Sequence, residues 1–182
     1  MTTFPAENQQ RLLLEAGLDA YFNAQWIDIG DIGEVARRLH VVSDTMVTCG
    51  LQTATTSYDP TSWPHKVWIT SLTPAWSLVL AVAGIIPDTM ERLSAGGHRV
   101  FEIFGDDEEM EQIQYAFDGD ILGEFFAYEE FNAYWQDLSY DSLEEELEMY
   151  LCIMGRITGR FFDRDWLASQ GLLGEVPWTT RP

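Results

Sequence analysis

Apolar residues recur at helical spacing in the first forty residues. Over residues 7–26 the apolar positions are Leu12, Leu13, Ala16, Ala20 and Ala24. Their mixed spacing of three and four residues predicts one helix. A second apolar stripe over residues 31–39 predicts a short helix, and Asp31 is suited to cap its N-terminus. Residues 1–40 are therefore expected to be helical, and residues 41–61 irregular with room for one strand.

The next segment has the pattern of paired strands. Residues 66–72 and 76–82 are two apolar runs, and Thr73-Pro74 between them is a turn signal. A short helix is expected over residues 87–94. Two consecutive glycines, Gly96-Gly97, would end it because glycine adopts the left-handed conformation common after a helix.

Further strands follow this helix. Apolar and polar residues alternate over residues 99–104 and again over residues 112–117. Asp118-Gly119 then predicts a two-residue hairpin turn, with a return strand over residues 121–128. The pattern over residues 66–128 therefore predicts an antiparallel sheet of about five strands with one inserted helix.

Helix signals return in the last third of the chain. Ser142 followed by Glu145 three positions later forms a capping-box pattern. It opens a helix that is expected to end near Gly155 or Gly159. Asp163 is suited to cap a last short helix.

These elements together define the expected architecture. An aromatic-rich stretch over residues 130–138 adds one more helix, and Gly171 is expected to close the last one before an irregular tail. Helices in residues 1–40 and 130–171 would then flank the central sheet. Runs of helices and strands that are segregated along the chain are typical of an α+β fold. At 182 residues, the chain is expected to form one domain over residues 1–182.

Four segments resemble a domain family of unknown function found mainly in actinobacteria. They are Trp76-Ser77-Leu78-Val79-Leu80, Leu93-Ser94-Ala95-Gly96-Gly97-His98-Arg99-Val100, Tyr115-Ala116-Phe117-Asp118-Gly119, and the stretch from Thr158 to Leu167. Asp163 departs from the family pattern, which has a Thr there. The resemblance covers about residues 68–167. It implies a fold unit in a bacterial protein and no mechanism, because the motifs mark strands, a helix stop, a turn and a cap.

Composition narrows the setting. Hydrophobic residues make up 46% of the chain, which is enough for an ordinary core. No apolar run approaches the roughly 20 residues needed to span a bilayer. Residues 1–10 lack the basic and apolar regions of a secretory signal. Cys49 and Cys152 lie in apolar surroundings and are expected to be buried thiols, with a disulfide or a nucleophilic cysteine as the alternatives. These features favour a cytoplasmic protein that is not bound to a membrane.

Negative charge is the dominant feature of the composition. The chain has 30 Asp and Glu against 10 Lys and Arg, a formal net charge of −20. Such a charge repels phosphate backbones, so direct nucleic-acid binding is not expected. A basic protein is the favoured partner.

More than half of the acidic residues fall in one stretch. Residues 100–155, which we call the acidic tract, contain 17 Asp and Glu and no Lys or Arg. The tract is either a solvated surface or an electronegative face that recruits a basic partner. The residues proposed to contact the partner are Asp106, Asp107, Glu108, Glu109, Glu111, Glu129, Glu130, Tyr134 and Trp135. Replacing Asp106, Asp107, Glu108 and Glu109 together with serine is expected to weaken binding and its salt dependence.

The two aromatic residues in this set have two possible roles. Tyr134 and Trp135 lie among acidic residues directly after the predicted sheet. They could pack between helix and sheet, or remain exposed and anchor an Arg- or Lys-bearing partner.

Common catalytic and metal-binding motifs are missing from the sequence. There is no G-x-S-x-G elbow, phosphate-binding glycine loop or zinc-ligand histidine spacing. The acidic run at residues 106–111 lacks the alternation and the glycine of a calcium loop. We therefore expect no metal, no cofactor and no catalytic residue.

The sequence favours an acidic protein-binding domain. Such a domain would inhibit or regulate a basic protein, as immunity proteins and nucleic-acid mimics do. Two alternatives stay open: a structural subunit of a larger bacterial assembly, and an enzyme with an unrecognised site. The sequence does not determine the oligomeric state.

Overall fold

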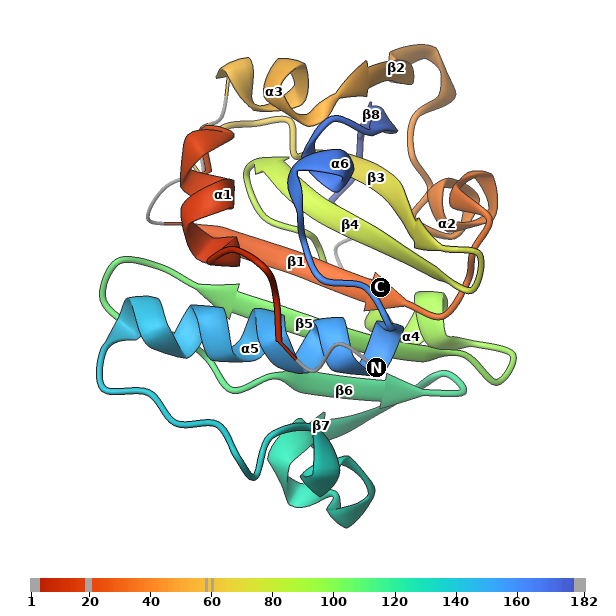
Figure 1. Cartoon of the computed structure of the whole chain (residues 1–182). Helices are drawn as coiled ribbons and strands as arrows, with labels where there is room; N and C mark the ends of the chain where they lie inside the picture. The colour runs from red at the N-terminus through yellow and green to blue at the C-terminus, as the bar shows by residue number, and fades with distance from the viewer. Residues whose placement is uncertain (1–3, 19–20, 58, 60, 179–182) are drawn as a thin grey trace.

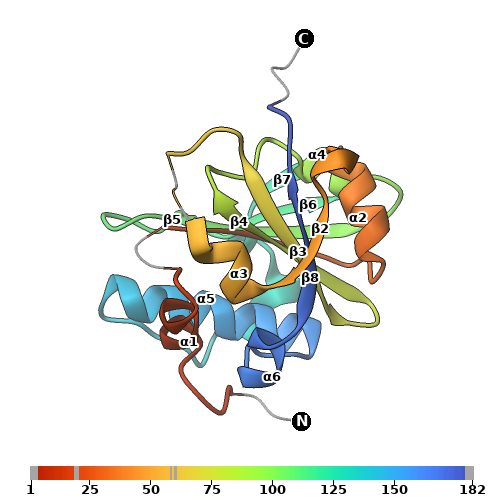
Figure 2. The same cartoon turned by 90° about the horizontal axis from the view of Figure 1, so that it is seen from above.

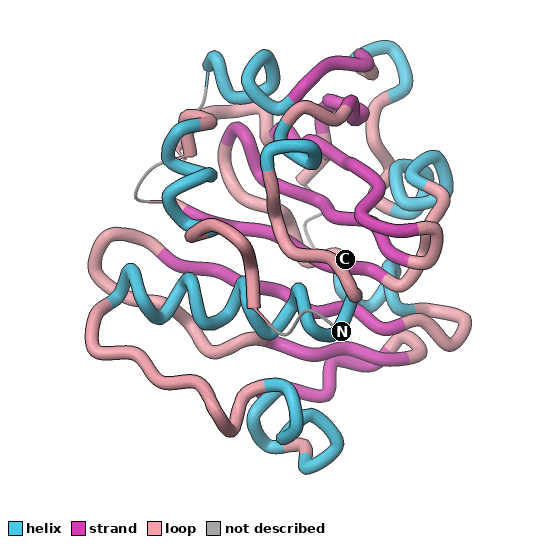
Figure 3. The backbone as a smooth tube through the Cα atoms, in the orientation of Figure 1, coloured by secondary structure: helices cyan, strands magenta, loops and turns pink. Residues whose placement is uncertain are grey.

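The structure is a computed structural model that describes residues 4–18, 21–57, 59 and 61–178. The strands are β1 Phe22–Ile27, β2 Val47–Gly50, β3 Lys66–Thr73, β4 Trp76–Ala83, β5 Arg99–Gly105, β6 Gln114–Phe117, β7 Asp120–Glu124 and β8 Gln170–Glu175. They form one antiparallel sheet in the order β2-β8-β3-β4-β1-β5-β6-β7 (Figure 3).

Helices cover both faces of this sheet. The α-helices are α1 Gln9–Glu15, α2 Ile32–Arg38, α3 Leu51–Ala54, α4 Met90–Ser94, α5 Leu143–Thr158 and α6 Arg164–Leu167. Four short 3₁₀ helices are η1 Ser43–Thr45, η2 Thr55–Ser57, η3 Phe125–Ala127 and η4 Glu129–Tyr134. Helices α1, α3, α5 and α6 lie on one side of the sheet, and α2 and α4 on the other (Figures 1 and 2).

Strand β1 is central to the packing, since it pairs with β4 on one side and β5 on the other. Alternate side chains of a strand point to opposite faces. Trp26 accordingly belongs to the larger core cluster, under α1 and α5, and Ile27 belongs to the smaller cluster on the α2 and α4 face. The core is thus two apolar layers separated by the sheet.

Several local predictions are confirmed. Helix α2 forms where expected, and the Asp31 carboxylate accepts hydrogen bonds from the backbone N–H groups of Gly33 and Glu34. Strands β3 and β4 pair as a hairpin across the predicted turn. The turn between β6 and β7 has positive φ at Asp118 (51°) and Gly119 (90°), which the predicted two-residue turn requires.

The predicted start and end of α5 are also confirmed. Ser142 Oγ accepts the backbone N–H of Glu145 at 3.2 Å. The Glu145 carboxylate in turn accepts the N–H of Asp141, one residue before the cap, at 2.8 Å. Gly159, at φ 79°, ends the helix. Asp163 caps α6 by accepting the N–H of Trp166 at 2.7 Å.

The predicted helix over residues 7–26 is wrong. Helix α1 ends at Glu15, and Gly17 adopts a φ of 89° that turns the chain. Residues 22–27 are instead the central strand β1. The apolar spacing misled because Asn23 and Gln25 look like surface positions, whereas both are buried.

The expected number of strands is also wrong, since the sheet has eight. Besides β1, the prediction missed β8, which lies between β2 and β3 where a tail after Gly171 was expected. The return strand over residues 121–128 is shorter, because β7 ends at Glu124 and η3 follows. Two expected helices are shorter as well: η4 replaces a helix over residues 130–138, and α4 begins three residues later than predicted.

Candidate functional site

The acidic tract covers one half of the sheet and the elements beside it. It runs from β5 through the β5–β6 loop, the β6–β7 hairpin and η4 into α5. Figure 1 shows these segments in the lower half of the molecule. The β5–β6 loop and the start of α5 lie at the left of the view, and the short helices η3 and η4 that follow β7 lie at the bottom. The predicted contact residues therefore lie in two places, the β5–β6 loop and η4.

The β5–β6 loop is built around Asp106. Its Oδ1 accepts backbone N–H groups of Glu108 at 2.8 Å and Glu109 at 3.0 Å, and these hydrogen bonds hold the pKa of Asp106 below its usual range. Asp106 thus shapes the turn. Asp107, Glu108 and Glu109 are exposed around it.

The two predicted aromatic residues pack against the core. Trp135 is half-buried and meets Phe126 edge to face at 5.2 Å between ring centroids. Tyr134 is half-buried too and packs against the larger core cluster, while its backbone carbonyl oxygen accepts Arg156 Nη1 at 2.8 Å. Glu129 and Glu130 beside them are exposed. The geometry therefore supports the packing role for both aromatic side chains.

A hollow of about 550 Å³ lies between α1, the β5–β6 loop and the start of α5. We call it the Leu14 hollow. Its apolar lining consists of Leu14, Phe22, Met110, Leu143 and Leu147. Three carboxylates, those of Asp106, Asp107 and Glu144, also line it. The fold thus brings part of the β5–β6 loop together with the first turn of α5, and η4 does not contribute.

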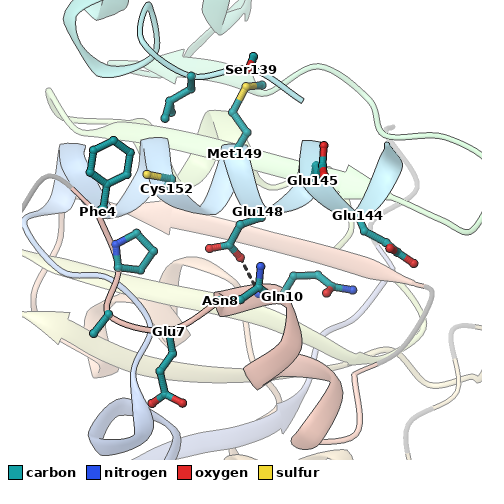
Figure 4. A pocket seen from close by; sticks show the side chains of 13 residues that line it. Phe4, Glu7, Asn8, Gln10, Ser139, Glu144, Glu145, Glu148, Met149 and Cys152 are labelled. Carbon is teal, nitrogen blue, oxygen red and sulfur yellow. Dashed lines mark hydrogen bonds between the residues drawn. The ribbon is translucent and has the colours of Figure 1, made fainter. Parts of the chain in front are cut away.

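A second hollow, of about 540 Å³, continues along α5 and shares Gln10 and Glu144 with the first. Figure 4 shows its wall of residues from the N-terminal segment facing α5. Its carboxylates are those of Glu7, Glu144, Glu145 and Glu148. Neither hollow has a Lys or Arg among its lining residues.

Most of these carboxylates already have partners. Glu7 is paired with Arg164 at 2.9 Å, and Glu145 takes part in the cap of α5. Glu148 accepts the backbone N–H of Gln10 at 2.8 Å (Figure 4), and its burial raises its pKa. Glu148 therefore fixes the start of α1 against α5.

Asp107 and Glu144 differ from these groups. Both are exposed, and neither forms a hydrogen bond or ion pair through its side chain within the part of the chain that the structure describes. Glu144 was missing from the predicted contact residues. Its position beside Glu145 and Glu146 in the first turn of α5 was the available signal.

The tract as a whole is barely neutralised. Among its acidic residues, the described part of the chain contains one ion pair, between Asp137 and Arg156. Arg156 Nη1 donates to Asp137 Oδ1 at 2.7 Å and Nη2 donates to Oδ2 at 3.0 Å. This contact lowers the pKa of Asp137. No other acidic residue of the tract is in an ion pair with a Lys, Arg or His within the described residues.

Glu102 has a different environment from the rest of the tract. It lies on β5 facing the α4 side of the sheet. Its Oε1 accepts Gln25 Nε2 at 2.9 Å and Asn23 Nδ2 at 3.2 Å. The same two amides hold the chain before α4, because Gln25 Oε1 accepts the Thr89 hydroxyl and Asn23 Oδ1 accepts the Ile86 N–H. Burial raises the pKa of Glu102 more than the two amide hydrogen bonds lower it.

This environment predicts a pH-dependent stability. A carboxyl whose pKa is raised on folding opposes folding once it ionises, so its cost appears as pH rises above about 4. Glu102→Gln keeps the acceptor oxygen and removes the charge. We expect the variant to gain stability over the wild type between pH 4 and pH 7, measured by urea unfolding at each pH. A stability difference that does not change with pH would contradict the assigned pKa direction.

The described residues show no grouping of three or more His, Cys, Asp or Glu side chains that could hold a metal ion. Both cysteine thiols are buried, and burial raises the pKa of each. No helix in the described part of the chain is long and apolar enough to cross a membrane. No protein-family model, curated protein or solved structure matches the chain. The resemblance to the actinobacterial domain family stays a prediction.

Proposed function

We propose that this chain is a cytoplasmic acidic binding domain that inhibits or regulates a basic protein, in the manner of an immunity protein or a nucleic-acid mimic. One observation carries the proposal. The acidic tract has 17 carboxylates and, within the described residues, one ion pair. Charge of one sign that is concentrated in one part of a folded chain costs stability through self-repulsion, and binding a cationic partner removes part of that cost.

The same charge gives the domain a kinetic advantage. A field of one sign attracts an oppositely charged protein and can raise association rates 10-fold or more at low salt. Basic proteins that act on nucleic acids carry such a complementary surface. An acidic domain that covers that surface would block access of the nucleic acid.

The proposal is tested by affinity capture from lysate of the native host. The tagged chain is the bait, and bound proteins are eluted with stepwise salt and identified by mass spectrometry. A second bait carries Asp107→Ser, Glu108→Ser and Glu109→Ser, and it keeps Asp106 because that residue holds the turn. We expect one basic protein to elute at moderate salt and to bind the triple variant several-fold more weakly.

Other outcomes would overturn the proposal. The absence of any enriched basic protein would contradict the proposed function. Equal capture by both baits would contradict a role for the β5–β6 loop. A competing nucleic acid that fails to displace the domain from a nucleic-acid-binding partner would contradict mimicry.

An assembly subunit is the second candidate, and the open edge of the sheet favours it. Strand β2 lies at one end of the strand order. Val42, Met46 and Val47 are exposed on and beside it, and Val47 is 56% exposed. Asp44 is the one charged residue in residues 41–57. A partner that buries this edge would stay bound at high salt, which distinguishes the two candidates.

A further inference from the structure

We propose that the Leu14 hollow receives an arginine side chain of the basic partner, together with an apolar residue beside it in the partner's sequence. The proposal rests on the proposed function and names the place where the partner is anchored.

The shape and lining of the hollow favour such a segment. Leu14 is 44% exposed and lines the hollow together with the apolar side chains of Met110 and Leu147. Covering Leu14 would remove apolar surface from water. The hollow's volume of about 550 Å³ lies within the usual range for sites that enclose part of a ligand. It is therefore large enough for a long side chain and an apolar neighbour.

The charge of the hollow selects arginine as the occupant. Asp107 reaches it from the β5–β6 loop and Glu144 from α5, so carboxylates are contributed by two different elements. Neither carboxylate has a hydrogen bond or ion pair with another described residue, and no Lys or Arg among the described residues lines the hollow. An arginine can lay its methylene stem on apolar side chains while its guanidinium meets carboxylates. Guanidinium is also more weakly hydrated than the ammonium of lysine, so it enters such a site at lower cost.

Other carboxylates of the two hollows already accept hydrogen bonds that hold the local structure, so they are not free to bind an arginine. Asp106 holds its turn, and Glu148 holds the start of α1. The guanidinium is thus expected to meet Asp107 and Glu144, one on each side.

The test uses the full chain and a defined probe. The probe is a short amidated peptide with the sequence Gly-Leu-Arg-Leu-Gly, and the control peptide has neutral citrulline in place of arginine. Binding is followed by NMR titration of the labelled protein. We expect the arginine peptide to shift methyl signals of Leu14, Met110 and Leu147, and the citrulline peptide to bind at least 10-fold more weakly.

Two double variants with equal charge change separate the hollow from the general field. D107N/E144Q neutralises the hollow, and D120N/E124Q neutralises two exposed carboxylates outside it. We expect at least a 10-fold loss of peptide affinity in D107N/E144Q and less than a 2-fold loss in D120N/E124Q. Thermal unfolding of both variants shows whether either loss reflects misfolding.

The alternative results are distinguishable. Equal losses in both variants would overturn the anchoring site and leave the acidic binding function standing. Absence of arginine-peptide binding to the wild type would also overturn the site, while capture of a basic protein from lysate would still support the function. Failure of both experiments would overturn both proposals.

Discussion

Replacing Trp26 with alanine is expected to lower the free energy of unfolding by about 4 kcal/mol. Trp26 is 1% exposed on the central strand β1. It is opposite Leu78 of β4 and Phe101 of β5, and it stacks on Phe162 at 6.1 Å between ring centroids. Truncation to alanine removes these contacts and leaves a cavity under α5. The resulting decrease in the free energy of unfolding is measured by urea unfolding.

Trp178→Ala is the matched control for this prediction. Trp178 is 48% exposed and stacks on the His65 ring at 5.3 Å, outside both core clusters. We expect its replacement to change the free energy of unfolding by less than about 1 kcal/mol. Similar effects of the two substitutions would contradict the central position of β1.

Replacing Gly171 with alanine is expected to destabilise the protein by about 3 kcal/mol, through overpacking. A Cβ at this position would lie 2.6 Å from the carbonyl oxygen of Ile69 and 2.6 Å from the ring of Trp68. Neither neighbour can move, because Ile69 is paired in β3 and Trp68 is fully buried. The expected loss corresponds to a decrease in Tm of roughly 10 °C.

Gly50→Ala tests whether this effect is specific to the close approach. Gly50 faces Gln170 in the neighbouring strand pair, and its Cβ would come no closer than 3.4 Å to a flexible side chain. We expect a loss of about 1 kcal/mol, which reflects the preference for glycine over alanine at the N-cap of α3 and involves no overpacking. A mild effect of Gly171→Ala would mean that β8 does not dock as closely as described.

Local signals in the sequence were sufficient for the caps and turns. Asp31, Ser142 and Asp163 each bond backbone N–H groups within three residues, and Asp118-Gly119 makes its turn alone. Such features depend on the neighbouring residues and therefore appear in the sequence.

The missed strands depend on distant residues. Asn23 and Gln25 are buried in β1 because Glu102 and the chain before α4 supply their hydrogen bonds. Gly171 sits inside β8 because Trp68 approaches it closely, whereas a glycine after a helix usually marks an end. The alternation of Phe22, Ala24 and Trp26 with the polar Asn23 and Gln25 was a local strand signal for β1 that the helical spacing over residues 7–26 outweighed. For β8, the glycine concealed the strand.

The candidate site also has features that the local sequence shows and features that depend on distant residues. The acidic loop was visible in the sequence as a run of carboxylates. Glu144 lies more than thirty residues later in the sequence, and only the tertiary fold places it on the same hollow as Asp107. The role of Asp106 in the turn, and the packing of Trp135 on Phe126, likewise required coordinates.

The affinity of the captured basic protein for this chain, measured across a series of salt concentrations, tests the central claim most directly. If the acidic tract binds the partner, the dissociation constant rises steeply between about 50 and 500 mM salt, because exposed charges are screened within a few ångströms at the upper end. The increase in the dissociation constant is expected to come mainly from slower association. A dissociation constant that is unchanged by salt would contradict electrostatic recognition and favour an apolar interface such as the β2 edge.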